Sequence, residues 1–289
     1  MKRVLAVFVA WLVLGTAPAL AEPALWRLAD DDTEIWMFGT MHVLPAGVDW
    51  RTERLNAAID DADVIYLETP VDDETIAAFM PSVLEWATLP EDESLSAMLP
   101  PEGVERLRNI AKAANYPFDA LDRYEPWFVS LMIANFGFAA SGQTADHGVE
   151  TGLLETLTQG NSDADLAFLE TPEAQIRPMA ELPRNVQVSM LMDALMPQIR
   201  EAPRPDLMEL WLSGDQVEIE QAVNGAIRDL APALYDVVLV RRNLNWTIQI
   251  EDMLEQDGVF LIAAGAAHFP GPDGVVTMLR NRGHVVEGP

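Results

Sequence analysis

Two stretches decide the expected fold: IWMFGTMH at residues 35–42 and GVFLIAAGAAH at residues 258–268. Each is an apolar run that reaches a glycine and places a histidine three residues later. Short apolar runs bounded by polar residues or by Gly and Pro suit strands buried on both faces of a sheet. A glycine at the strand end lets the chain turn tightly, so His42 and His268 should project over the sheet's edge.

Two further apolar runs also end alike. ADVIYLETP at 62–70 and ADLAFLETP at 164–172 each place a glutamate, Glu68 or Glu170, directly after a predicted strand. The stretch 24–38 reads as two short strands around a turn of three aspartates, and HVVEG near the C-terminus as a last strand. Four ionisable side chains are therefore expected at strand ends, where open α/β sheets build their sites.

Between these runs the apolar residues recur three or four positions apart, which is typical of helices. The helical stretches are 51–62, 101–114, 124–140, 184–196, 206–215 and 234–256. Strands that alternate with long helical stretches predict an α/β fold with a central, mostly parallel sheet and helical insertions. No linker rich in Pro, Gly or Ser interrupts the chain, so residues 22–289 are expected to form one domain.

The first 21 residues have the order of a secretory signal peptide: Lys2 and Arg3, an apolar stretch, and small residues that end at Ala21. We therefore expect a periplasmic or secreted protein that has no integral membrane span after cleavage. A net charge of −28 disfavours nucleic acid as a partner. The chain has no cysteine, which excludes disulfides, thiolate metal sites and a cysteine nucleophile.

The residues at the predicted strand ends suit metal chemistry. Two neutral imidazoles and one or two carboxylates can hold a divalent transition metal ion and leave positions open for water. Each residue also has a simpler interpretation. His42 and His268 can be hydrogen-bonded loop histidines, and Glu68 and Glu170 can cap helices or lie at solvated strand ends.

The pair FGTMHVLPAG and AGAAHFPGPDGVVTMLRNRGHVV resembles the two Gly-x-x-His motifs of the TraB/PrgY/GumN family, whose superfamily includes the Tiki metalloproteases. The likeness extends to YLETP, to HGVETGLLETLTQGNSDADLAFLETPEAQ and to VRRNLNWTIQIEDML, and the GumN-like bacterial branch is the most similar. It covers nearly all of the mature chain. The resemblance also implies the α/β architecture, with the paired strand and Gly-x-x-His motifs at the sheet edge.

Carried over by position, the resemblance implies a set of site residues. They are His42 and His268 as the paired histidines, Glu68 and Glu170 after the two strands, and Arg242 with Asn243 on the late helix. One segment departs from the family: Gly148-Val149-Glu150 replaces the common Gly-Leu-Asp, and Glu150 is left out of the predicted site for that reason. His147 and His284 match no catalytic position and are expected in loops or at the surface.

The leading hypothesis is an exported metal-dependent hydrolase, most plausibly a peptidase or amidase that acts on a peptide or another small polar substrate. His42, His268 and Glu68 would hold the ion, which lowers the pKa of a bound water. Glu170 would move the proton, although the roles of Glu68 and Glu170 can be exchanged. Arg242 would stabilise negative charge on the substrate, or it would simply pair with nearby carboxylates.

Two other hypotheses stay open. The chain also resembles the related erythromycin esterases, which suggests a metal-independent hydrolase with a histidine as general base on water. The third hypothesis is a binding protein without turnover, for haem, a peptide or a saccharide, because histidine can serve as an axial ligand of haem.

Overall fold

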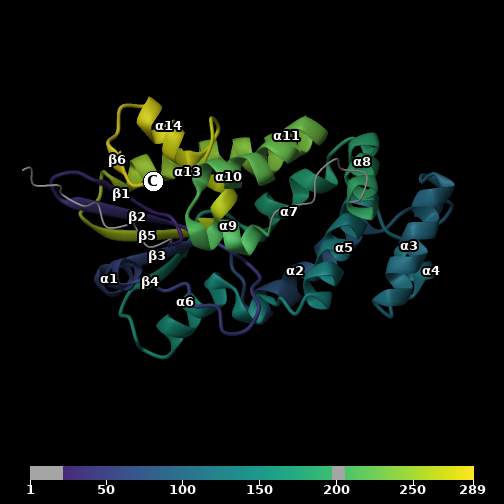
Figure 1. Cartoon of the computed structure of the whole chain (residues 1–289), viewed down its shortest axis with the longest axis horizontal. Helices are drawn as coiled ribbons and strands as arrows, with labels where there is room; N and C mark the ends of the chain where they lie inside the picture. Colours follow the sequence, from purple (N-terminus) through teal and green to yellow (C-terminus); the bar gives the residue numbers. More distant parts are fainter. Residues whose placement is uncertain (1–21, 197–205) are drawn as a thin grey trace, which may run out of the picture.

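The computed structural model describes residues 22–196 and 206–289. The predicted signal peptide, residues 1–21, lies outside the described residues. Figure 1 shows a sheet at one end of an elongated molecule and a group of helices that extends toward the other end. In the described part of the chain, no helix is both long enough and apolar enough to cross a membrane.

The sheet has six strands in the order β4-β3-β5-β2-β1-β6. Their bounds are β1 Leu25–Ala29, β2 Thr33–Thr40, β3 Val64–Leu67, β4 Asp165–Phe168, β5 Gly258–Gly265 and β6 Val286–Glu287. The neighbours β4, β3, β5 and β2 run parallel, whereas β1 pairs antiparallel with both β2 and β6. The predicted α/β fold with a mostly parallel sheet and helical insertions is confirmed, as are the N-terminal hairpin and the last strand.

Helices cover both faces of the sheet. On one face, α13 (Arg241–Met253) and α14 (Val275–Asn281) bury residues such as Trp246 and Leu279 against the sheet. On the other face, α1 (Glu53–Asp61), α6 (Val149–Thr158) and α9 (Leu207–Ser213) do the same with Leu55, Leu153 and Trp211. Because both faces are covered, the central strands are apolar throughout, and their polar neighbours come only at the strand ends.

The helical end of the molecule has its own apolar clusters. It contains α2 Asp73–Ala87, α3 Pro101–Ala113, α4 Phe118–Leu121, α5 Pro126–Ala140, α7 Pro172–Ala180 and α8 Arg184–Leu195. The chain then passes through α9, α10 (Gln216–Ile219), a π-helix (Glu220–Gly225), α11 (Ala226–Leu230) and α12 (Pro232–Tyr235). A second π-helix, Asp236–Val240, leads directly into α13.

Most predicted helices are present within a few residues of their expected bounds, but the longer helices α2, α6, α7 and α14 and the short helices α4, α10 and α11 lie outside the predicted stretches. Pro81 lies inside α2 and Pro178 lies inside α7. Proline ordinarily ends or kinks a helix, so local signals argued against both elements. The predicted helix 234–256 is split into α12, the second π-helix and α13.

The four predicted strand ends meet at one edge of the sheet. The β2 residue Thr40 pairs with Gly265 at the end of β5, and Leu67 of β3 pairs with Ala263. The next two residues of β3 and β4 continue this alignment, because the backbone N–H of Glu170 donates to the carbonyl of Glu68 at 2.9 Å. The carboxyl ends of four adjacent parallel strands thus deliver His42, His268, Glu68 and Glu170 to one place.

Candidate functional site

Arg242 joins the carboxylates of Glu68 and Glu170 and the ring of His268 into one buried network. Its Nε donates to Glu170 Oε1 at 2.9 Å, and its Nη2 donates to both Glu68 and Glu170. Its Nη1 donates to the carbonyl of Val238 at 3.0 Å and to Nε2 of His268 at 3.2 Å. A guanidinium has five N–H groups, so all of them have acceptors.

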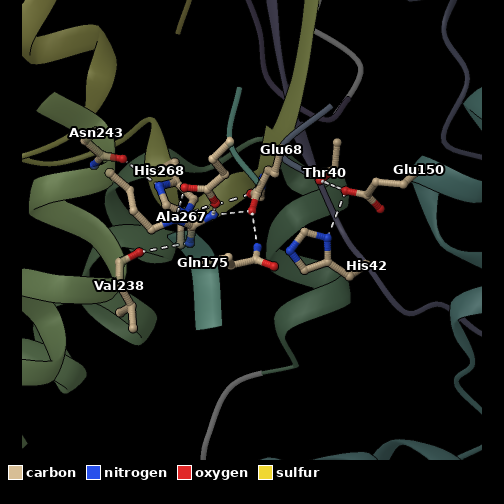
Figure 2. A network of polar contacts seen from close by, with 12 residues as sticks. Thr40, His42, Glu68, Glu150, Gln175, Val238, Asn243, Ala267 and His268 are labelled. Carbon is tan, nitrogen blue, oxygen red and sulfur yellow. Dashed lines mark hydrogen bonds and ion pairs between the residues drawn. The ribbon is translucent and has the colours of Figure 1, made fainter. Parts of the chain in front are cut away.

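Glu68 is held at the centre of this network, between His42 and His268 (Figure 2). Its Oε1 accepts from the backbone N–H of Gly265 at 2.6 Å, and its Oε2 accepts from Gln175 Nε2 at 3.0 Å as well as from Arg242. Burial alone would raise the pKa of Glu68, but the charge of Arg242 and the other donors outweigh burial and hold the pKa well below its ordinary value. Glu68 is therefore a fixed carboxylate.

His268 is buried and neutral. Its Nδ1 lies 2.5 Å from Oδ1 of Asn243, whose Nδ2 donates to the carbonyl of Asp273 at 2.7 Å. Because the amide nitrogen of Asn243 already faces a carbonyl, its oxygen must accept the Nδ1–H of His268, and Nε2 is left with a lone pair. The ring packs on Trp246 with centroids 4.3 Å apart. Burial lowers the pKa of His268 to about 3.

His42 lies in a very different environment. Its Nδ1 is 2.8 Å from Oε1 of Glu150, which is buried and also accepts from the hydroxyl of Thr40. The His42 side chain is 59% exposed, against 6% for His268. Partial desolvation favours the neutral ring, but the nearby carboxylates of Glu150 and Glu68 outweigh it and raise the pKa of His42 to about 9.

Two hollows open beside this network. The first, which we call the His42 hollow, has a volume of about 250 Å³ and is lined by His42, Glu68, Thr69, Val71, Ile76, Ala145, Glu150, Thr151 and Gln175. The second, the Glu170 cleft, has a volume of about 690 Å³ and includes Glu170, Arg242 and Trp246 among its lining residues. Burial raises the pKa of Glu170, and the nearby charge of Arg242 offsets this rise only in part. His268 lines neither hollow.

The structure thus brings together all six predicted site residues and adds two that sequence reasoning missed. Glu150 stands where the family resemblance implies aspartate, yet its longer side chain reaches both Thr40 and His42. Gln175 had no motif of its own, but it lies one turn into α7, the helix that begins at Pro172, the last residue of Glu-Thr-Pro. The sequence signal available for Gln175 was its position shortly after the predicted strand that ends at Glu170.

The two remaining histidines lie outside the network. His147 is exposed in a short 3₁₀ helix, Ala145–His147, that precedes α6. His284 is partly buried, and its Nε2 lies 3.0 Å from Glu251 of α13. Neither residue lines either of the two hollows.

The predicted metal ligands His42, His268 and Glu68 do not fit a metal ion in their present bonding. Arg242, a permanent cation, donates to His268 Nε2 and to Glu68. The pKa of His42 is raised to about 9, so a metal ion would have to displace a proton from this ring at neutral pH. Across residues 22–196 and 206–289, no group of three or more His, Asp or Glu side chains is arranged to hold a metal ion.

Comparison with known proteins gives one match. No curated protein and no solved structure matches the chain. The family model described as TraB/PrgY/gumN family matches residues 24–288, which include both strand and Gly-x-x-His units, the two Leu-Glu-Thr-Pro segments and the helix that carries Arg242. The chain therefore belongs to the TraB/PrgY/gumN family.

Proposed function

We propose that the protein is a hydrolase in which His42 acts as a general base on the water that attacks an ester or amide carbonyl. The observation that supports this most is the pair formed by Glu150 and His42. A buried carboxylate holds Nδ1 of an exposed imidazole, so Nε2 is the atom that faces Glu68 and Gly265. In general base catalysis such a carboxylate fixes the ring and stabilises the imidazolium that forms.

The proposed reaction has two steps. First, Nε2 of neutral His42 takes a proton from water, the water oxygen bonds to the carbonyl carbon, and the carbonyl electron pair moves to oxygen. Next, the carbonyl reforms, the bond to the alkoxide or amine breaks, and His42 Nε2–H returns the proton to the leaving group. The carboxylate of Glu150 lies 2.8 Å from Nδ1 and faces the ring when it is charged.

The other network residues are proposed to position Glu68 and the strand ends. All five N–H groups of Arg242 are used within the protein, so Arg242 acts by holding Glu68, Glu170 and His268 in register. Asn243 fixes the tautomer in which His268 can accept from Arg242. Arg242→Lys should therefore reduce turnover, because lysine keeps the charge but loses the planar fork.

The substrate is proposed to be a peptide or another small polar compound. The His42 hollow is polar around His42, Glu68 and Gln175, and its volume of about 250 Å³ suits one small group of a substrate. The acidic protein would repel a strongly anionic substrate. The predicted signal peptide supports action in the periplasm or outside the cell.

Turnover of p-nitrophenyl acetate and of alanine p-nitroanilide tests the proposal, with wild type and His42→Gln compared on the same day at about pH 9, where neutral His42 is available. The proposal expects wild-type hydrolysis of at least one probe and its loss in His42→Gln. His147→Gln is the matched control, because His147 is exposed and lies outside both hollows. Equal turnover in wild type and His42→Gln would reject His42 as the base.

A metal-dependent hydrolase is the second candidate, because Nε2 of His42, Oε1 of Glu68 and the ring of His268 surround one point above Gly265. Like the first candidate, it requires deprotonation of His42, and it requires in addition that Arg242 release His268 Nε2. Elemental analysis of protein purified without chelators or nickel resin separates the two candidates. A stoichiometric metal that is lost in His42→Gln would favour the second, and full turnover in metal-free protein would favour the first.

A further inference from the structure

Gly265 and Gly39 occupy the same position in the two Gly-x-x-His motifs, but they are glycines for different reasons. The backbone of Gly265 has φ −50° and ψ 132°, a conformation that other residues adopt readily. Gly39 belongs to the regular strand β2. Neither position requires glycine for its backbone conformation, so the reason must lie in what surrounds each Cα.

A Cβ on Gly265 would project among the functional groups. It would lie 3.1 Å from Oε1 of Glu68, 3.2 Å from Nε2 of His42 and 3.6 Å from Cδ2 of His268. A Cβ on Gly39 would instead meet the backbone of the partner motif, 3.1 Å from the Cα of Ala266. Gly39 thus permits two backbones to pack, whereas the missing Cβ of Gly265 lets a proposed base and a fixed carboxylate approach the same point of the backbone.

We propose that Gly265 keeps open the site of the attacking water, which lies between Nε2 of His42 and Oε1 of Glu68. This inference rests on the proposed hydrolase and goes beyond it by assigning the position of the nucleophile and a role for Glu68. His42 Nε2 takes one hydrogen of the water, and Glu68 Oε1 accepts a hydrogen bond from the other. Glu68 Oε1 already accepts the Gly265 N–H at 2.6 Å, and a carboxylate oxygen has a second lone pair for the water.

Gly265→Ala and Gly39→Ala form a matched pair that tests this inference. In Gly265→Ala the methyl group displaces the water, so kcat should fall about 100-fold with KM little changed, because an interaction with the nucleophile and not with the substrate is lost. Its melting temperature should fall by less than that of Gly39→Ala, since the exposed ring of His42 can shift away from the methyl group. Gly39→Ala should lower the melting temperature, because its methyl meets backbone, and the folded fraction should keep its kcat.

A high-resolution crystal structure of each protein provides a readout that does not depend on turnover. Wild type should show one ordered water within hydrogen-bond distance of His42 Nε2 and Glu68 Oε1, and Gly265→Ala should show none. If no water occupies this position in wild type, or if Gly265→Ala keeps wild-type kcat, the inference is overturned. If wild type hydrolyses neither probe, the proposed hydrolase and the role of the water as nucleophile fail together, while the crystal structure still decides whether Gly265 maintains a water site.

Discussion

The two Gly-x-x-His motifs end adjacent parallel strands with the same spacing, yet their histidines have opposite environments. His42 is 59% exposed, paired with Glu150, and has a pKa raised to about 9. His268 is 6% exposed, bonded to Asn243, packed on Trp246, and has a pKa lowered to about 3. The motif sets where an imidazole is placed, and the neighbouring helix sets what the imidazole can do.

The helices explain the divergence. The first turn of α6 lies against the loop after β2, where the backbone N–H of Val149 donates to the carbonyl of Met41, and it brings the acid Glu150. Helix α13 lies beside the loop after β5 and brings an amide, Asn243, together with an aromatic ring. An acid beside an exposed ring favours the charged form, and burial beside an amide favours the neutral form.

The largest expected effect is on kcat, and mutations of the two histidines should differ in how much stability they cost. His42→Gln should lower kcat by about 10³-fold, within the range that general acid–base catalysis contributes, with a nearly unchanged melting temperature at about pH 9, where the stabilising charge of the His42 ring is lost. His268→Ala should also lose turnover, but it removes a fully packed ring and should cost roughly 3 kcal/mol of unfolding free energy. Chemical denaturation and steady-state kinetics on the same preparations provide both values. Equal stability losses in the two variants would contradict the comparison.

Glu150→Gln should have the next largest effect, because it removes the charge that raises the pKa of His42. The pKa of His42 should move down toward its ordinary value of 6.5. In wild type, kcat/KM should rise with pH up to about 9, since only neutral His42 can accept a proton. In Glu150→Gln this rise should occur at lower pH and reach a lower plateau. A pH–rate profile that is identical in the two proteins would remove Glu150 from the account.

A smaller effect concerns stability at alkaline pH. The folded-state pKa of His42 lies above its unfolded value, so its contribution to stability is fully present below pH 6.5 and is lost as the pH rises to about 9. The melting temperature of wild type should therefore fall over this range more than that of His42→Gln. If the melting temperatures of wild type and His42→Gln change in parallel between pH 6.5 and 9, the His42 ring is not protonated in the folded protein.

His268 should produce the opposite dependence at acidic pH. Its folded-state pKa lies below its unfolded value, so its contribution to stability is present above pH 6.5 and is lost as the pH falls toward 3. The difference in unfolding free energy between wild type and His268→Gln should shrink over that range. The quantity to measure is the difference in unfolding free energy between wild type and His268→Gln. The effects of carboxylates that titrate in the same pH range are common to both proteins and cancel in this difference.

The sequence was sufficient to predict the strand ends and the residues they carry. Apolar runs followed by Gly-x-x-His or Glu-Thr-Pro placed His42, His268, Glu68 and Glu170 at one edge, because parallel strands align their carboxyl ends. The roles of these residues could not be predicted, since they depend on contacts between distant segments. His42 and Glu150 are 108 residues apart, and Arg242 and Glu68 are 174 residues apart.

Two kinds of information were absent from the local pattern. The helices α2 and α7 contain Pro81 and Pro178, so tertiary packing overrides the local preference of these segments. The tautomer of His268 is set by Asn243, whose own orientation is set by the carbonyl of Asp273. No periodicity in the sequence encodes that chain of hydrogen bonds.

An NMR titration of the imidazole nitrogens of wild type tests the central claim most directly. The signals of His42 and His268 can be assigned with His42→Gln and His268→Gln. We expect that His42 titrates near pH 9 and that His268 stays neutral, with its proton on Nδ1, from pH 9 down to about pH 4. Two histidines that titrate together near 6.5, or a His268 protonated on Nε2, would contradict the claim that one motif serves two different roles.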